Sequence, residues 1–179
     1  MTAWPAVTLL ADANQALTLA EVRARVHDFL PPDGPESSLG PRREVTWLRL
    51  PGQVAGGDGH WVIDSDYPTL NQVDLWLVSD GQLMQHRRMG SALSFDQRPM
   101  PSRVPALAVQ LPAGQVHEFN LRVRTDSSVV LPIRLSKPSA FLQRESRVQM
   151  AQGLIAGVAL AGALPARCAP SSHRQATVN

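Results

Sequence analysis

The stretch Val73-Asp74-Leu75-Trp76-Leu77 decides the fold, and Phe119-Asn120-Leu121-Arg122-Val123-Arg124 repeats its pattern. In both stretches apolar residues alternate strictly with polar residues or tryptophan. Successive side chains of a β-strand point to opposite faces, so each stretch offers one face to a core and one face to solvent. The sequence therefore predicts two half-buried strands, whose polar faces form one surface if the strands are neighbours in a sheet.

The side chains on these solvent faces are of kinds that hold a small polar ligand. Trp76 can stack on the apolar face of a sugar ring, and Arg122 and Arg124 can bind a carboxylate or phosphate. In the alternative interpretation another element or a second subunit covers Trp76, and the arginines pair with Asp74 or another acid. Arg98, in a loop before a proline, either lines the site or binds backbone carbonyls of its own loop. The candidate ligand-binding residues are Asp74, Trp76, Arg98, Asn120, Arg122 and Arg124.

Short strand-like runs separated by turns fill the middle of the chain. The predicted strands are 45–50, 60–64, 72–78, 83–88, 104–111, 117–124 and 129–135. Asp80-Gly81 is a strong signal for a tight hairpin turn between two of them. This number and spacing of strands predict an all-β fold, an antiparallel sandwich of jelly-roll type.

Helices are expected only at the two ends of this β domain. Residues 17–30 carry a helical apolar stripe, with Thr18 and Glu21 as a capping box at its start. Residues 149–166 are nearly all apolar and resemble the beginning of a transmembrane helix. The predicted organisation is an N-terminal lead (1–15), a β-sandwich (16–145), this apolar segment (149–166) and a disordered tail (167–179).

Composition excludes several classes of function. The 179 residues carry a formal net charge of +2 without a basic cluster, which argues against nucleic-acid binding. The single cysteine, Cys168, rules out an intrachain disulfide and a cysteine-based zinc site. The N-terminus lacks the basic region of a signal peptide. Sequence motifs of hydrolases, metalloproteases, nucleotide-binding loops and dinucleotide cofactors are missing, so we expect neither enzymatic activity nor a cofactor.

Acidic residues suggest one further, weaker alternative. Asp58, Asp64 and Asp66 lie close enough in sequence to offer oxygen ligands to calcium, but they lack the spacing of a calcium loop. The five histidines show no paired spacing. We therefore expect no metal site.

A set of short motifs occurs in one order along the chain. They are Trp47-Leu48-Arg49; Trp61-Val62-Ile63-Asp64 with Tyr67-Pro68 and Leu70; Val73-Asp74-Leu75-Trp76-Leu77; Gly90, Phe95 and Arg98-Pro99; Phe119-Asn120-Leu121-Arg122-Val123-Arg124 with Ser127-Ser128 and Pro132-Ile133; and Gly153-Leu154-Ile155-Ala156-Gly157. In order and spacing they resemble the type 2 extracellular sensor domain of seven-transmembrane receptors with diverse intracellular signalling modules. The resemblance spans about residues 16–162.

The resemblance implies a periplasmic or extracellular jelly-roll domain similar to carbohydrate-binding modules, placed before seven membrane helices and a signalling output module. The chain departs from the pattern at Ser91, where the family has an aspartate, and after Pro165, where the first membrane helix is cut short. Two functions are therefore expected as alternatives. One is a sensor for a small molecule such as a carbohydrate or carboxylate. The other is a structural or dimerisation module without such a ligand. Membrane association through residues 149–166 is a further expectation.

Overall fold

The computed structural model describes residues 4–42, 44–126 and 128–163. Their elements, in chain order, are η1 (Trp4–Ala6), β1 (Thr8–Asp12), α1 (Leu19–Ala24), η2 (Val26–Asp28), β2 (Ser38–Pro41), β3 (Val45–Gln53), β4 (His60–Ser65), β5 (Gln72–Ser79), β6 (Gln82–Met89), η3 (Phe95–Gln97), β7 (Ala106–Gln110), β8 (Val116–Arg124), β9 (Ser128–Val130), β10 (Ile133–Ser136) and α2 (Pro138–Ala163). The chain divides after Phe141 into two compact units. The strands described here all belong to the first unit, and the second continues α2.

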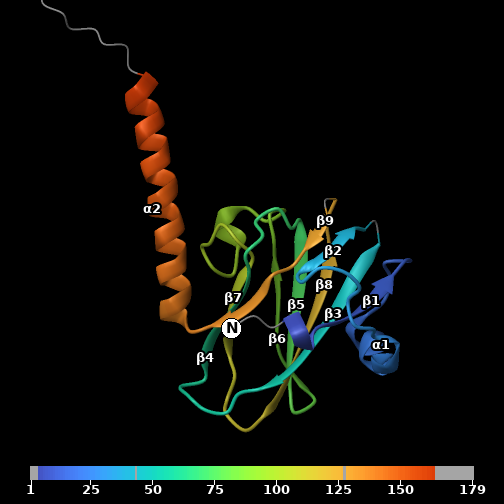
Figure 1. Ribbon diagram of the computed structural model, residues 1–179. Helices are drawn as coiled ribbons and strands as arrows, with labels where there is room; N and C mark the ends of the chain where they lie inside the picture. The colour runs from blue at the N-terminus through green and yellow to red at the C-terminus, as the bar shows by residue number, and fades with distance from the viewer. Residues whose placement is uncertain (1–3, 43, 127, 164–179) are drawn as a thin grey trace, which may run out of the picture. The chain divides into compact units, whose positions relative to one another are not determined.

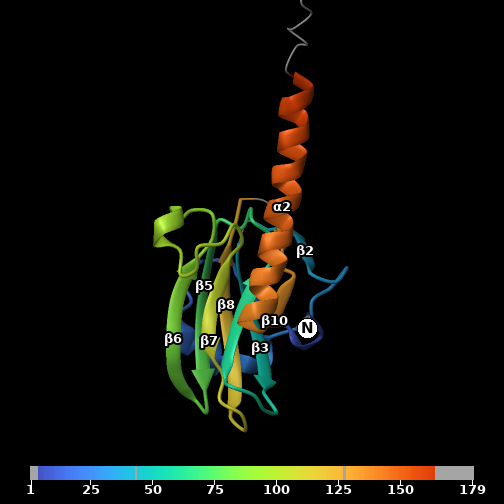
Figure 2. The same cartoon turned by 90° about the vertical axis from the view of Figure 1, so that its left-hand side faces the viewer.

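The strands form antiparallel sheets, which Figures 1 and 2 show from two sides. The largest sheet has five strands in the order β1-β3-β8-β5-β6. A second sheet has the order β10-β4-β7, and β2 pairs with β9 in a short third sheet. This arrangement agrees with the predicted all-β class, with antiparallel sheets and a C-terminal helix, whereas the jelly-roll strand order stays a prediction.

The alternation seen in the sequence builds the main core. Leu75 of β5 lies opposite Leu121 of β8, which lies opposite Leu48 of β3, and the next inward row is Leu77, Phe119 and Leu50. All six side chains are buried in one hydrophobic cluster that also contains Ile63 and Leu107 of the second sheet. Burial of side chains of this size contributes about 1.5–3 kcal/mol each, which makes these rows the main stabilising feature of the fold.

The predicted hairpin at Asp80-Gly81 is confirmed. β5 and β6 pair from Val73↔Met89 to Ser79↔Gln82, which leaves exactly these two residues in the turn. Their φ angles are 46° and 84°. Two central residues with positive φ are the requirement of a type I′ turn, whose twist matches that of the flanking strands.

The N-terminal region differs from the prediction. The capping box of Thr18 and Glu21 is present, but α1 is shorter than the predicted helix 17–30, because η2 replaces its second half and Leu30 makes a β-bridge with Leu9. Residues 1–15, expected as a lead, supply η1 and β1 to the first unit, and β1 forms an edge of the five-stranded sheet. β2 lies in a segment expected as a loop.

A single predicted strand, 129–135, proves to be two strands in different sheets. β9 pairs with β2 and β10 pairs with β4, and Leu131-Pro132 separates them. Proline has no backbone N–H to donate to a ladder, so a strand is readily interrupted there.

The C-terminal helix also differs from the prediction. α2 begins at Pro138, well before the predicted apolar segment 149–166, and its first turns carry charged residues such as Arg144 and Arg147. Within the part of the chain that the structure describes, no helix combines the length and apolar character that crossing a membrane requires. Residues 149–163 of the predicted apolar segment are helical, but an apolar helix of transmembrane character is not confirmed within the described residues. The predicted disordered tail, 167–179, lies outside them.

Candidate functional site

The face of the five-stranded sheet that points away from the main core carries most of the predicted ligand-binding residues. We call it the outer face, and it includes Asp74, Trp76, Asn120 and Arg122. β5 and β8 are neighbours, with Asp74 opposite Arg122 and Trp76 opposite Asn120. The two stretches that opened the sequence analysis therefore do share a surface.

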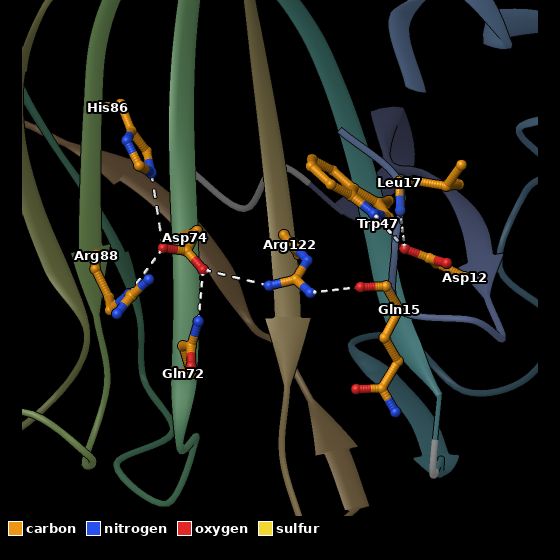
Figure 3. Close-up of polar contacts among 9 residues, drawn as sticks. All are labelled: Asp12, Gln15, Leu17, Trp47, Gln72, Asp74, His86, Arg88 and Arg122. Atoms are coloured by element: carbon orange, nitrogen blue, oxygen red, sulfur yellow. Dashed lines mark hydrogen bonds and ion pairs between the residues drawn. The ribbon is translucent and has the colours of Figure 1, made fainter. Parts of the chain in front are cut away.

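Asp74 is the centre of a polar network on this face (Figure 3). Its carboxylate accepts hydrogen bonds from Gln72 Nε2 at 2.7 Å and Arg88 Nε at 3.0 Å. His86 Nε2 lies 3.6 Å from one carboxylate oxygen, and Arg122 lies 3.9 Å from the other. The side chain of Asp74 is only 4% exposed, so these neighbours replace the water that a free carboxylate would bind.

Arg122 is partly exposed and has two partners. Besides its ion pair with Asp74, it donates a hydrogen bond to the backbone carbonyl of Gln15 at 3.2 Å. Gln15 has a φ of 56° in the loop between β1 and α1, and Figure 3 shows Gln15 beside Arg122. Arg122 thus ties the loop before α1 to the sheet.

An aromatic stack runs along the outer face beside this network. The ring centroids of Trp47 and Trp76 are 5.1 Å apart, and those of Trp76 and His86 are 4.5 Å apart with an interplanar angle of 2°. Trp47 is buried in a second hydrophobic cluster with Val22 of α1, and Trp76 packs against the same cluster. Trp47 therefore fills a core, and this core is the one between the sheet and α1.

Asp12 holds the segment before α1 against this stack. Its carboxylate accepts hydrogen bonds from the backbone N–H of Ala16 and Leu17 and, at 3.4 Å, from Trp47 Nε1. The capping box then starts α1 directly after this segment. In this capping box, the backbone N–H and the hydroxyl of Thr18 donate hydrogen bonds to the Glu21 carboxylate and lower the pKa of Glu21. The loop before α1 and α1 itself, which are distant from β5 and β8 in sequence, thus cover part of the outer face.

Asn120 belongs to a second polar group on the same face. It donates from Nδ2 to Glu118 at 2.9 Å, and Arg49 Nε binds the other oxygen of Glu118 at 2.7 Å. Asn120 is fully buried, and its Oδ1 has no hydrogen-bond partner among the described residues. Arg49, Glu118 and Asn120 lie side by side on β3 and β8.

These contacts correct the expectation of an open polar surface. Asp74 and Asn120 are buried, Trp76 is half-buried, and Arg122 is engaged with Asp74 and Gln15. The physical reason is that α1 and the loop before it cover part of the face, while arginines on neighbouring strands neutralise its acids. A ligand at the centre of this face would have to displace internal hydrogen bonds.

The other two predicted residues lie elsewhere. Arg124 is exposed near the end of β8, beside a pocket that also has Arg42 and Thr125 in its walls. Arg98 donates to the backbone carbonyls of Leu93 and Ser102 and lies over the ring of Phe95. Arg98 therefore ties its loop together, and neither arginine joins the Asp74 network.

Of the three aspartates considered for calcium, Asp58 and Asp66 point to basic partners, and Asp64 is buried. Asp66 forms ion pairs with Arg103 and Arg134, and Asp58 forms one with Lys137. The hydrogen bond from Lys137 is the main reason that the pKa of Asp58 is lowered. Among the described residues, no group of acids, histidines and cysteines is arranged to hold a metal ion.

Lys137 joins the end of β10 to the β3–β4 loop, directly before α2. Its ammonium binds Asp58 and the carbonyl of His60, and it lies 4.2 Å from the ring centroid of Trp61. We call Lys137 and these three partners the junction clamp. Trp61 is accordingly half-buried against the main core rather than fully inside it.

A pocket of about 230 Å³ lies on the inward side of the same sheet, at the end of β3. Its lining is Pro5, Ala6, Leu50, Pro51, Gly52, Gln53, Val54, Ile63, Leu111, His117, Phe119 and Leu135. It lies between the two larger sheets, with η1 beside its opening. The sequence analysis missed this pocket. The one available signal was a glycine at position 52, where the inward alternation Leu48-Leu50 calls for an apolar side chain.

Comparison with known proteins gives one family match. A family model described as 7TMR-DISM extracellular 2 matches residues 5–137. The match begins in η1 and ends directly before α2, so it covers the strands and excludes the segment Gly153–Gly157 that entered the sequence resemblance. No curated protein matches the chain.

Proposed function

The chain belongs to the 7TMR-DISM extracellular 2 family, and on that premise we propose that it senses a small molecule and reports its binding through α2. The domain is an extracellular sensor domain of a receptor and is extracellular or periplasmic in its parent receptor. The ligand and the route of the signal are the proposed parts.

The observation that carries the proposal is the connection between β10 and α2. β10 pairs with β4 inside the sandwich, ends at Ser136, and is followed by Lys137 and then by the 26-residue helix α2. The junction clamp fixes Lys137 to the β3–β4 loop. A change in the packing of β10 therefore acts directly on the residue from which the helix starts. Ligand binding can shift this element only by its difference in affinity for two arrangements.

The ligand class expected from the sequence was a carbohydrate on the outer face. Trp76 is stacked between Trp47 and His86, so the 45% exposed side chain of His86 is the stacking group that a sugar could reach there. Against this, Asp74 and Arg122 already bind each other and their neighbours. We therefore keep a carbohydrate as one arm of the test and do not assign it to the Asp74 network.

The proposal is tested by a thermal-shift screen of the 179-residue chain against sugars, carboxylates and small apolar compounds. Each compound that raises Tm is then examined by hydrogen-exchange mass spectrometry. We expect altered exchange in the peptides that cover β10 and the start of α2. A compound that raises Tm without changing exchange there contradicts the signalling part. No Tm shift from any of the three classes contradicts ligand sensing as a whole.

A second candidate function is a dimerisation or protein-interaction module without a ligand. The observation that favours it is β6, which stands at the edge of the five-stranded sheet with Leu83 55% exposed and Met84 61% exposed. Exposed edge strands can pair with another chain. Analytical ultracentrifugation of the chain and of Met84→Lys tests it: a dimer that the substitution dissociates supports this function, and a monomer at all concentrations contradicts it.

A further inference from the structure

We propose that the pocket beside Gly52 binds a small, neutral, apolar molecule of about the size of one substituted aromatic ring. This inference rests on the proposed sensing function and adds the site and the ligand class. It assigns the ligand to the inward side of the sheet, opposite to the surface that the sequence indicated.

The pocket exists because one inward side chain is missing. β3 and β8 keep one continuous register from Thr46↔Val123 to Gln53↔Val116, so the inward positions of β3 are Leu48, Leu50 and Gly52. Leu48 and Leu50 are buried in the main core. A Cβ built at Gly52 would meet no atom within 4 Å, although Gly52 lies in a strand directly opposite the buried His117. The backbone of Gly52 does not have positive φ, so nothing in its conformation requires glycine.

The opposite wall comes from the second sheet. Ile63 of β4 and Leu135 of β10 are cross-strand partners, and both line the pocket. Leu50 and Phe119, also partners, line it from the five-stranded sheet. A molecule in the pocket would therefore contact both sheets at once and would pack between pairs of apolar side chains, where burial of apolar surface is the main source of affinity.

The buried polar side chain in the wall, His117, has already used its hydrogen bonds. His117 Nε2 lies 3.0 Å from the carbonyl oxygen of Pro112, and Nδ1 lies 2.8 Å from Ser79 Oγ. The carbonyl can only accept, so Nε2 carries a proton, and both ring nitrogens are engaged. Gln53 donates from Nε2 to the carbonyl of Gly114 at 3.0 Å. His117 therefore offers a ligand its ring face rather than a free donor, and one N–H of Gln53 is engaged, so a sugar or carboxylate would lose most of its hydration without replacement.

The size of the pocket limits the ligand. A cavity of about 150 Å³ lined by apolar side chains is known to hold benzene. The pocket here has a volume of about 230 Å³, which suits a ring with a short substituent. Larger, polar ligands normally occupy pockets with a few polar groups directed at them, and these walls do not supply such groups.

The pocket adjoins the route proposed for the signal. Leu135 lines the pocket and Lys137 of the junction clamp follows it by two positions, immediately before α2. Ile63 is the cross-strand partner of Leu135 and lies two positions from Trp61 in β4. The ammonium of Lys137 lies over the ring of Trp61. A ligand that separates β10 from β3 would therefore act on the clamp through residues that already touch the pocket or flank it.

The test is an NMR titration of the 179-residue chain with toluene, with glucose as the polar comparison. We expect toluene to shift the amide signals of pocket residues, including Gly52, His117 and Leu135, and to raise Tm, because a ligand that binds the folded state stabilises it. Glucose is expected to leave these signals unchanged. Toluene shifts that lie outside the pocket, or glucose shifts within it, overturn the assignment. If the signals of the pocket residues shift with protein concentration rather than with toluene, a second copy of the chain occupies the pocket, and this also overturns the assignment.

Cavity-filling variants give the decisive comparison. Gly52→Leu places a side chain in the empty space and is expected to weaken toluene binding by about tenfold or more. The toluene affinity of Gly52→Ala should lie between those of Gly52→Leu and the unchanged chain. Gly56→Leu is the matched control, because a Cβ at Gly56 also meets no atom within 4 Å and Gly56 does not line the pocket. Equal toluene affinity for Gly52→Leu and Gly56→Leu overturns the proposal, and the Ala variant supplies this comparison if the Leu variant fails to fold.

Failure of the pocket and failure of the sensing function give different results. If toluene occupies the pocket while hydrogen exchange at the start of α2 stays unchanged, the site stands and the sensing function fails. If another compound changes exchange there equally in Gly52→Leu and in the unchanged chain, sensing stands and this pocket is not its site.

Discussion

The outer face and the pocket beside Gly52 lie on opposite sides of the same strands, β3 and β8. They differ in where their polar side chains make hydrogen bonds and ion pairs. On the outer face, Asp74, Arg88 and Arg122 form a network around a carboxylate that is 4% exposed. In the pocket, His117 and Gln53 direct their hydrogen bonds into the protein and leave an empty apolar space.

This difference shows that residue types suited to ligand binding do not by themselves make a binding site. Trp76 and Arg122 have the chemistry to hold a sugar or an acid, but Trp47, His86, Asp74 and Gln15 already occupy their contact surfaces. The pocket consists of ordinary core residues and owes its space to a glycine. In order of expected effect, three substitutions test the structural role of the outer face and a fourth tests the junction clamp.

Trp47→Ala should produce the largest loss. Trp47 is fully buried between the sheet and α1 and stacks on Trp76. Removal of a buried tryptophan lowers the free energy of unfolding by about 3–5 kcal/mol, which urea unfolding would measure. Val116→Ala, at an exposed position of β8, is the control and should change it by less than about 0.5 kcal/mol. A small effect at Trp47 would mean that α1 does not form a real second core.

Asp74→Ala should lower the free energy of unfolding by about 2–3 kcal/mol, because it leaves Gln72, Arg88 and Arg122 without their shared partner. Chemical denaturation measures this loss, and Arg124→Ala, at the exposed end of β8, is the control for removal of an exposed charge. If Asp74→Ala proved neutral for stability but removed binding of a sugar, the outer face would be the ligand site after all.

Thr18→Ala should cost about 1 kcal/mol, since the Thr18 side chain caps α1 and supports Glu21. The expected readout is a lower midpoint of thermal unfolding together with increased hydrogen exchange in residues 16–24. Thr18→Ser keeps the capping oxygen and should restore most of the stability. An equal loss in both variants would show that the capping hydrogen bond is not the cause.

The smallest effect concerns pH and the junction clamp. The pKa of Asp58 is lowered chiefly by its hydrogen bond from Lys137. A carboxyl group with a lowered folded-state pKa stabilises the fold above its ordinary pKa, and this contribution is lost as pH falls through the folded-state value. Asp58→Asn should therefore flatten the decrease in Tm between about pH 5 and pH 3. Asp33→Asn, at an exposed loop position, is the charge control, and an identical change in both variants would contradict the role of Lys137.

Local sequence patterns predicted a large part of the fold. The alternation around Leu75 and Leu121 predicted strands with one core face, Asp80-Gly81 predicted the hairpin, and Thr18 with Glu21 predicted the start of α1. These features depend on neighbours within a few residues, so the sequence carries them directly. β1 and β2 were missed because they are short and lack a clear alternation, and their pairing partners are distant in the chain.

By itself, the sequence determined the β class of this protein, the two strands that begin its description and the family to which it belongs. Only the tertiary structure decided which faces of those strands are accessible. Asp74 and Asn120 became buried because the segment around α1 covers part of their face, Gln72 and arginines of β6 and β8 surround Asp74, and Glu118 binds Asn120. The pocket is defined by atoms that are absent at Gly52 and by walls from η1, β3, β4, β8 and β10. Alternation specifies where a side chain points, whereas exposure depends on what the rest of the chain places beside it.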